Sequence, residues 1–308
     1  MKKLSLITPV FNEEQTLPVY LSELNVFKKA LENYSIEWII VDDGSTDATS
    51  KIISEYAESS NGIISLIFSR NFGKEAALFA GLEASTGDIV IPMDIDLQDP
   101  FEVIFQMIDR YEKGAEVVLA KRSNRDSDSR FKRKSALWFY KLNNKMSSLQ
   151  LEENVGDFRL MTRQVVDEIV CLQENQLFMK GLMSWVGFQT AVVTYERPIR
   201  SEGTTKFNFF KLWNLAVQGI TSFSTIPLKV WSYFGGFVSL LSFLYGLKII
   251  FEKIFLGISA SGYASLMVAI LFFGGVQLIG IGVLGEYIGR TYIESKRRPK
   301  YIIKKKIN

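Results

Sequence analysis

Two long apolar segments near the C-terminus, Trp231–Phe251 and Tyr263–Ile288, place the strongest constraint on how this chain can fold. As a helix, each is long enough to cross a hydrocarbon core of about 30 Å, which takes about 20 mostly apolar residues. The short loop Gly257–Gly262 lies between them. The sequence therefore predicts a two-helix transmembrane hairpin after a larger, more polar N-terminal region.

Basic residues beside these segments predict their orientation, because Lys and Arg accumulate on the cytoplasmic side of a membrane. The tail is rich in Lys and Arg from Lys296 to Lys306. At the other end, the apolar run after Met1–Lys3 is too short for the core of a signal peptide. We therefore expect both termini in the cytoplasm. Lys248, inside the first segment, could extend toward the membrane surface or face a partner helix.

The composition excludes several kinds of function. A net charge of +3 over 308 residues is too small for a nucleic-acid-binding surface, which needs clustered basic residues. The chain has no histidine and a single cysteine, Cys171, so the usual zinc sites, disulfides and Ser-His-Asp catalysis are excluded. Any catalysis must therefore use carboxylates, amides, Lys and Arg.

The N-terminal region alternates short β-rich runs with stretches of helical periodicity. This alternation is typical of the α/β class, in which helical crossovers join parallel strands and ligands bind at the carboxyl ends of the strands. Four helices fit between the five predicted strands, which are Leu4–Pro9, Trp38–Asp42, Ile63–Phe68, Ile89–Asp94 and Glu116–Ala120. Polar residues follow four of these strands, at Asn12–Glu13, Asp42–Ser45, Arg70–Lys74 and Asp94–Gln98, and we expect them to form one site.

The strongest chemical signal is the group Asp94, Asp96 and Gln98. Alternate residues on an extended segment share a face, so these side chains could present their oxygens together. Hard oxygen ligands suit Mg²⁺ or Mn²⁺, and such an ion would neutralise a departing nucleotide diphosphate. The alternative is a solvated acidic turn that caps a helix near Pro100.

Other charged residues suggest contacts to a nucleotide and to phosphates. Asp42 and Asp43 could accept hydrogen bonds from a base or ribose, although such strings are often only a turn with a helix cap. Lys74, near a helix start, could meet a phosphate or could be a surface lysine. The phosphate of a lipid could be bound by Arg122, Arg200 and Lys206. The alternative is that these residues belong to a solvated basic surface.

Four further stretches have features that suggest a function. Asp157 could position a sugar or act as a base, or it could pair with Arg159 in a turn. Two basic and aromatic stretches, Ser123–Ser148 and Phe207–Ile220, suit helices at a membrane interface, although either alone could be an ordinary packed helix. Gly280–Gly285 matches the G-x-G-x-x-G dinucleotide pattern, but it lies in an apolar segment and follows no strand, so we reject it.

Several motifs together resemble a known family. The early ones are Thr8–Glu13, Val41–Asp47, Ser69–Lys74 and Asp94–Pro100, and they resemble glycosyltransferase family 2 with its GT-A fold. The later ones resemble the bactoprenol (undecaprenyl phosphate) glucosyltransferases, relatives of dolichol-phosphate mannose synthase. These are Gly156–Leu160, Gly181–Gly187, Thr204–Phe207 and the paired apolar segments.

On the donor side, the resemblance implies that Asp94, Asp96 and Gln98 serve a metal, Mg²⁺ or Mn²⁺, and the donor diphosphate. It also implies that Asp43 and the segment from Pro9 to Asn12 hold the nucleotide. Ile95 between the two acids is a mild departure that leaves metal binding intact.

On the acceptor side, the resemblance implies that Asp157 lies near the catalytic centre and that Arg200 and Lys206 bind the lipid phosphate. Enzymes of this kind use UDP-glucose and invert the anomeric carbon, giving a β-linked lipid-phosphate glucose. They also form homo-oligomers such as tetramers. A phosphate monoester has a second pKa of ~6, so near neutrality this acceptor is mostly a dianion and needs no histidine base.

The sequence thus predicts a bacterial inner-membrane enzyme that transfers glucose from UDP-glucose to polyprenyl phosphate. Its expected parts are a GT-A catalytic domain (1–200), an amphipathic interface region (201–229), two transmembrane helices (230–290) and a basic cytoplasmic tail (291–308). One alternative is another sugar, such as mannose, N-acetylglucosamine or an aminoarabinose derivative. A polysaccharide synthase is disfavoured because its Gln-x-x-Arg-Trp motif is absent. A third alternative is a non-catalytic membrane scaffold that binds nucleotide.

Overall fold

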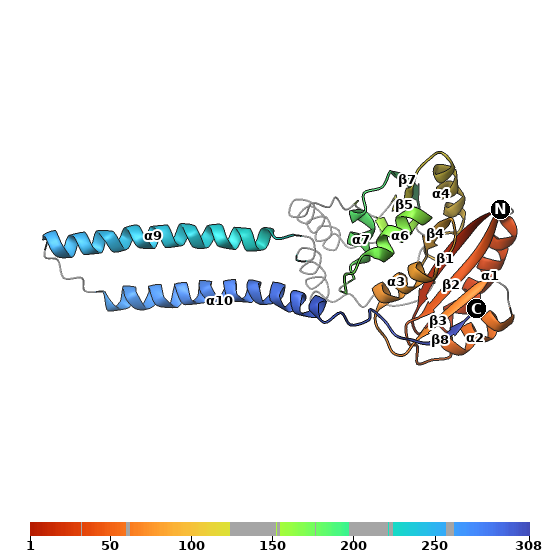
Figure 1. Cartoon of the computed structure of the whole chain (residues 1–308), viewed down its shortest axis with the longest axis horizontal. Helices are drawn as coiled ribbons and strands as arrows, with labels where there is room; N and C mark the ends of the chain where they lie inside the picture. Colours follow the sequence, from red (N-terminus) through yellow and green to blue (C-terminus); the bar gives the residue numbers. More distant parts are fainter. Residues whose placement is uncertain are drawn as a thin grey trace.

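The protein is elongated, with an α/β domain at one end and two long helices that project from it (Figure 1). This computed structural model describes residues 1–31, 33–59, 62–123, 152, 155–175, 177–196, 221, 224–256 and 262–308. Several expectations concern residues outside these ranges: Arg200, Lys206, most of the stretch Ser123–Ser148, and the stretch Phe207–Ile220.

An eight-stranded sheet in the order β7-β5-β6-β4-β1-β2-β3-β8 organises the described part of the domain. β4, β1, β2 and β3 run parallel to their neighbours in this set, and β5 pairs in parallel with β7. β6 and β8 are antiparallel to the strands beside them. The strands are β1 (Lys2–Val10), β2 (Tyr34–Asp42), β3 (Ile63–Phe68), β4 (Ile89–Pro92), β5 (Val117–Arg122), β6 (Val155–Thr162), β7 (Thr190–Tyr195) and β8 (Ile303–Ile307).

Helices cover both faces of this sheet, which explains why its central strands are nearly continuous runs of buried Ile, Leu and Val. One face packs against α1 (Thr16–Ala30), α2 (Thr49–Ser59) and α4 (Glu102–Glu112). The other packs against α3 (Lys74–Ala84), α6 (Arg163–Cys171) and α7 (Met179–Trp185). The predicted α/β class and the four crossover helices are therefore confirmed.

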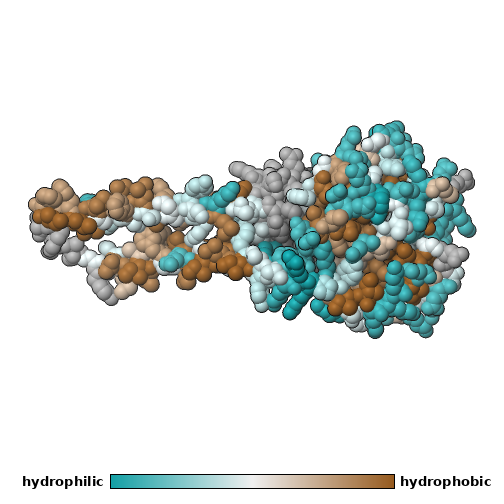
Figure 2. Space-filling model, viewed as in Figure 1, coloured by the Kyte–Doolittle hydropathy of each residue, from teal (hydrophilic) through white to brown (hydrophobic). Residues whose placement is uncertain are grey.

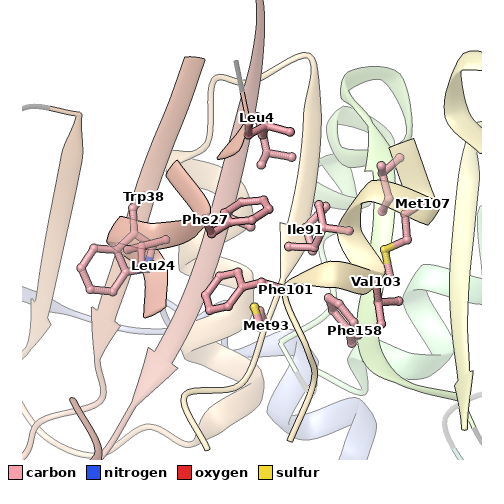
Figure 3. Close-up of a cluster of buried hydrophobic side chains, with 14 of the residues drawn as sticks. Leu4, Leu24, Phe27, Trp38, Ile91, Met93, Phe101, Val103, Met107 and Phe158 are labelled. Atoms are coloured by element: carbon pink, nitrogen blue, oxygen red, sulfur yellow. The ribbon is translucent and has the colours of Figure 1, made fainter. Parts of the chain in front are cut away.

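The first of these two cores is rich in aromatic side chains (Figure 3). Phe27 of α1 stacks on Phe101 with ring centroids 5.0 Å apart, and Trp38 of β2 is 1% exposed. The Trp38 indole donates a hydrogen bond to the Thr8 hydroxyl over 2.9 Å, so its polar atom is satisfied inside the core. This packing fixes β1 and β2 side by side, and their carboxyl ends carry part of the site.

Two helices, α9 (Ile226–Leu256) and α10 (Tyr263–Ser295), project away from the domain. By length and composition, their segments Ile226–Glu252 and Ser265–Ser295 are long and apolar enough to cross a membrane. Figure 2 shows apolar residues along their outer surface, which no other part of the described chain covers. The predicted hairpin is therefore present as two adjacent helices. Near its base, Gly280 of α10 lies directly against the Trp231 indole of α9.

The basic tail does more than the sequence indicated, because it returns to the domain and adds β8 to the edge of the sheet beside β3. The tail was expected only as a charged cytoplasmic segment. Its Lys-rich strand Ile303–Ile307 lacks the alternation of apolar and polar residues that marks a half-buried strand. An edge strand needs only backbone hydrogen bonds along one side, and Lys residues are common at such edges.

Candidate active site

A cavity of about 300 Å³ opens at the carboxyl ends of the parallel strands. It is lined by the chain that follows β1, β2, β3 and β4, as expected for a ligand site in this fold class. Most of the sequence-predicted donor-site residues lie in its wall, which includes Pro9, Asp43, Lys74, Asp94 and Asp96.

A three-residue charge cluster stands at this cavity. The Lys74 ammonium lies 2.7 Å and 2.9 Å from the two carboxylate oxygens of Asp94, and 2.8 Å from Oδ2 of Asp157. Burial lowers the pKa of Lys74, but the two carboxylates outweigh burial and raise it above its ordinary value. Lys74 therefore stays charged at physiological pH, and it joins the first half of the sheet to β6.

Asp157 is brought to the site by β6, although it lies far from the other acids in the sequence. Its side chain is 14% exposed. Burial raises its pKa, yet the charges of Lys74 and Lys180 prevail and hold the pKa below its ordinary value. Oδ1 of Asp157 has no hydrogen-bond partner in the described part of the chain. A buried ionised oxygen without a partner is available to a ligand.

Asp42 and Asp43 have different surroundings. Asp42 is fully buried, and its oxygens accept hydrogen bonds from the Ser45 amide and the Ser50 hydroxyl. It shapes the turn after β2 and does not line the cavity, unlike Asp43. The Asp43 carboxylate accepts hydrogen bonds from the Phe72 amide at 2.6 Å and the Gly73 amide at 2.9 Å. Burial, only partly offset by these bonds, raises the pKa of Asp43.

Asn12 joins the loop after β1 to the loop after β2. It has a positive φ of 54°, a conformation that Asn tolerates better than most residues. The side-chain oxygen of Asn12 accepts a hydrogen bond from the backbone amide of Thr46 over 2.9 Å. The backbone amide of Asn12 donates a hydrogen bond to the Ser45 hydroxyl, also over 2.9 Å. These bonds hold the wall of the cavity that contains Pro9 and Phe11.

The extended segment expected through Gln98 is not present. β4 ends at Pro92, the chain turns at Ile95, and Leu97 has a positive φ of 55°. Asp94, Asp96 and Gln98 therefore do not alternate along a strand, and the argument that they share a strand face was wrong. Asp94 and Asp96 still line the cavity, whereas the Gln98 side chain is buried and lies outside the lining.

Comparison with known proteins places this site in a family. The Glycosyl transferase family 2 profile matches residues 5–170 of the 308, which is more than half of the chain. The chain belongs to glycosyl transferase family 2. A second profile, described as the GtrB C-terminal hairpin, matches residues 226–291, which contain α9 and most of α10. The chain is thus a glycosyltransferase with an appended helical hairpin.

Similar proteins within family 2 align with this chain over nearly its whole length. The bactoprenol glucosyl transferase of Shigella phage SfV is 59% identical over 302 residues, covering 98% of both chains. The prophage bactoprenol glucosyl transferase homolog of Escherichia coli K12 is 56% identical, covering 98% of this chain and 99% of the relative. Among solved structures, glucosyl-3-phosphoglycerate synthase of Mycobacterium tuberculosis is 19% identical with a TM-score of 0.48, covering 71% and 78% of the two chains.

Arg122, predicted to bind a lipid phosphate, is already engaged in this family 2 enzyme. Its Nε donates to the Tyr195 hydroxyl over 3.3 Å, and its guanidinium lies 4.0 Å from the Asp99 carboxylate. The Tyr195 hydroxyl also donates to Asp99. Burial and Asp99 together raise the pKa of Tyr195 to about 12, so it remains a donor. This group joins β5, β7 and the loop after β4.

Sequence reasoning missed Glu75, the residue after Lys74. Its carboxylate accepts a hydrogen bond from the Met179 amide over 2.7 Å, which connects α3 to α7. Burial, aided by the charge of Asp157, raises the pKa of Glu75 to about 6. Nothing in the local sequence marks this residue, because its partners come from β6 and α7, which lie about a hundred positions later.

Proposed function

We propose that this family 2 enzyme transfers glucose from UDP-glucose to the phosphate of a polyprenyl lipid, with inversion, giving β-linked polyprenyl phosphate-glucose. The observation that carries the proposal is 56–59% identity, over 98% of the chain, to proteins named bactoprenol glucosyl transferases. A match of this extent includes both the cavity and the hairpin. The product would serve modification of a cell-envelope glycan.

The donor nucleotide would occupy the cavity at the strand ends. Pro9, Asn12 and Asp43 form or support the wall suited to the base and ribose, while Asp42 acts through the turn that it shapes. Lys74, with its ammonium in the same cavity, would meet the diphosphate. Because Lys74 is already held by two carboxylates, it is oriented before the donor binds.

A divalent cation, Mg²⁺ or Mn²⁺, fits the donor set here. Asp94 and Asp96 line one cavity, and Gln98 follows in the same turn. The described residues contain no cluster of three or more His, Cys, Asp or Glu side chains suited to a metal. Mg²⁺ is commonly bound by one or two carboxylates plus substrate phosphates. When bound, the ion would neutralise charge on the leaving diphosphate.

The acceptor needs little activation, because a phosphate monoester with a second pKa of ~6 is already mostly a dianion at neutral pH. Asp157 would position the reacting groups, or act as a base toward the monoanion. Arg200 and Lys206 remain the residues that the family resemblance assigns to the lipid phosphate. Arg122 would act beside them only if it exchanged Tyr195 or Asp99 for that phosphate.

We further propose a multi-pass protein of the bacterial inner membrane, with the catalytic domain and both termini in the cytoplasm. Pairing of β8 with β3 supports this topology, since the tail and the domain must then lie on the same side of the bilayer. Two crossings return the chain to that side, and the Lys and Arg residues of the tail favour the cytoplasm.

We propose a homo-oligomer, such as a tetramer, as the working form. We also propose that the catalytic domain, the interface region and the two transmembrane helices end at residues 200, 229 and 290, respectively.

Purified protein in detergent, incubated with polyprenyl phosphate and labelled UDP-glucose, UDP-N-acetylglucosamine or GDP-mannose, tests this function. We expect lipid-linked label from UDP-glucose, with dependence on both the lipid phosphate and a divalent cation. Transfer from another donor but not from UDP-glucose would contradict the choice of sugar. Release of free sugar that is independent of the lipid would contradict the acceptor.

A further inference from the structure

A second cavity, of about 210 Å³, lies among β5, β6 and α7 and is separate from the donor cavity. The residues that line it differ from those of the donor cavity. Arg159 of β6 and Lys180 and Ser184 of α7 supply its polar wall, and Val155, Met183 and Phe188 supply part of its apolar wall. None of the roles described above uses this cavity.

Two buried polar atoms without partners stand on β6 near this cavity. In the described part of the chain they are Oδ1 of Asp157 and Nε of Arg159. The two residues are separated by one position, and both are on the face covered by α3 and α7, because Asp157 contacts Lys74 while Arg159 lines the cavity with Lys180. Native proteins rarely leave such atoms unsatisfied, because a buried polar group without a partner loses its hydrogen bonds to water and gains none in return. Their concentration on one strand indicates a ligand.

The charges around the cavity favour an anion. Arg159 is 3% exposed, and within the described residues its guanidinium donates a hydrogen bond from Nη2 to the Gly156 carbonyl over 3.0 Å. Its neighbour Asp157 is already paired with Lys74. Lys180 contributes a second positive charge to the wall. Among the described residues that line the cavity, Glu152 is the one carboxylate; it lies 3.5 Å from the ammonium of Lys121 and is therefore partly neutralised.

We propose that this Arg159–Lys180 pocket binds the acceptor, a phosphate monoester attached to an apolar chain. The two cations would hold the phosphate, in addition to the role that the family resemblance assigns to Arg200 and Lys206. Val155, Met183 and Phe188 would contact the first part of the chain. Asp157 connects this pocket to the donor cavity through Lys74, which lines the latter. The lipid phosphate and the donor sugar would therefore meet at the Lys74–Asp157 pair. This inference rests on the proposed function, whose acceptor it places.

Binding of farnesyl phosphate, a short polyprenyl phosphate, to the full-length protein in detergent tests the pocket by calorimetry. Lys180→Ala should weaken this binding about ten- to a hundredfold, the effect of losing one charge-assisted contact. Arg159→Lys, which keeps the charge but loses Nε and the planar fork, should also weaken it. UDP affinity should stay within about twofold in both variants, and this would show that they remain folded. Lys113→Ala removes an exposed lysine that lines neither cavity and serves as the matched control.

Unchanged farnesyl phosphate affinity in Lys180→Ala and Arg159→Lys would overturn the pocket. Inorganic phosphate that binds as tightly as farnesyl phosphate, with the same losses, would identify a free-anion site and overturn the lipid assignment. The proposed function fails separately: if the parent protein binds farnesyl phosphate through these residues but transfers no glucose, the pocket stands and the reaction is wrong. Steady-state kinetics add a further check, since Lys180→Ala should raise KM for the lipid and leave KM for UDP-glucose unchanged.

Discussion

At the scale of single residues, the site depends on charges that come from distant parts of the sequence. Lys74 has two carboxylate partners, one from the loop after β4 and one from β6. The two carboxylates keep Lys74 protonated, and the charge of Lys74 helps to keep Asp157 ionised. Each group therefore stabilises the charged form of the other. Ordering these charges before the substrate arrives lowers the reorganisation that transfer requires.

Asp96→Asn should reduce transfer by about a hundredfold or more, because it removes the charge of a proposed metal ligand and metal-assisted charge stabilisation supplies several kcal/mol. The change keeps the shape of a side chain in the cavity wall, so the unfolding midpoint should hardly move. Initial rates over a range of Mg²⁺ and Mn²⁺ concentrations are the measurement. Asp109→Asn, at an exposed carboxylate of α4, is the matched control. Near-parental rates for Asp96→Asn at every metal concentration would show that Asp96 is not a metal ligand.

Glu75 should make stability depend on pH. Its pKa in the folded protein is raised to about 6, above the ordinary 4.5, so the folded state holds this proton more tightly than the unfolded state. The contribution is fully present below pH 4.5 and is lost as the pH rises through 6. Glu75→Gln keeps an acceptor for the Met179 amide but does not ionise. Thermal unfolding midpoints from pH 4.5 to 7.5 should therefore rise in this variant relative to the parent as the pH increases. A difference that is constant across this range would contradict the raised pKa.

At the scale of elements, the tail after α10 contacts the elements that form the proposed donor site. The Tyr301 ring stacks on Phe68 of β3 with centroids 5.0 Å apart, and Phe68 meets Phe72 edge-on at 5.8 Å. The Lys300 ammonium lies 3.5 Å from the Phe79 ring of α3 and donates to the Leu172 carbonyl over 2.8 Å. The membrane hairpin is thereby connected to the loop 70–74, whose amides bind Asp43.

Tyr301→Ala should weaken UDP binding about three- to tenfold, since an aromatic pair contributes about 0.5–1.5 kcal/mol and its loss frees the loop 70–74. Tyr301→Phe keeps the ring on Phe68, loses only the hydroxyl contact to Glu83, and should bind UDP nearly as the parent does. Calorimetric titration with UDP is the measurement, with Lys304→Ala in β8 as the control. Equal affinities for Tyr301→Ala and Tyr301→Phe would show that the stack does not position the donor loop.

At the scale of the whole molecule, the return of the tail to the sheet restricts how the protein can lie in a membrane. β8 pairs with β3, and Glu294 near the end of α10 accepts a hydrogen bond from the Asn175 amide over 2.8 Å. These contacts hold the base of the hairpin against the catalytic domain. Under the proposed function, the lipid acceptor and the nucleotide-sugar donor would then meet at a fixed height above the bilayer.

Cysteine labelling can test the proposed topology. In a Cys171→Ser background, which removes the chain's single cysteine, Ser261→Cys should react with an impermeant maleimide in intact cells. Asn308→Cys should react only after the cells are permeabilised, because the tail lies with the catalytic domain. Transfer activity of each variant shows that the label reports on folded protein. Labelling of position 308 in intact cells would contradict a cytoplasmic tail.

The sequence by itself determined the features that depend on local pattern. Apolar length predicts the two projecting helices, and alternation of strand and helix predicts the α/β class and its first five strands. The position of polar residues at strand ends predicts that they lie together, because parallel strands bring their carboxyl ends to the same edge of the sheet. The wall of one cavity indeed contains Asp43, Lys74, Asp94 and Asp96.

Only the tertiary structure decided which charges pair and which elements join the sheet. The contacts of Asp157 with Lys74, Glu75 with Met179, and Arg122 with Tyr195 each join residues more than 70 positions apart. Strand β8 has no apolar alternation to reveal it, and it is stabilised by an edge that only the folded domain provides. Local sequence carries the preference of a segment for helix or strand, whereas burial, ion pairing and edge pairing depend on neighbours that meet only after the chain has folded.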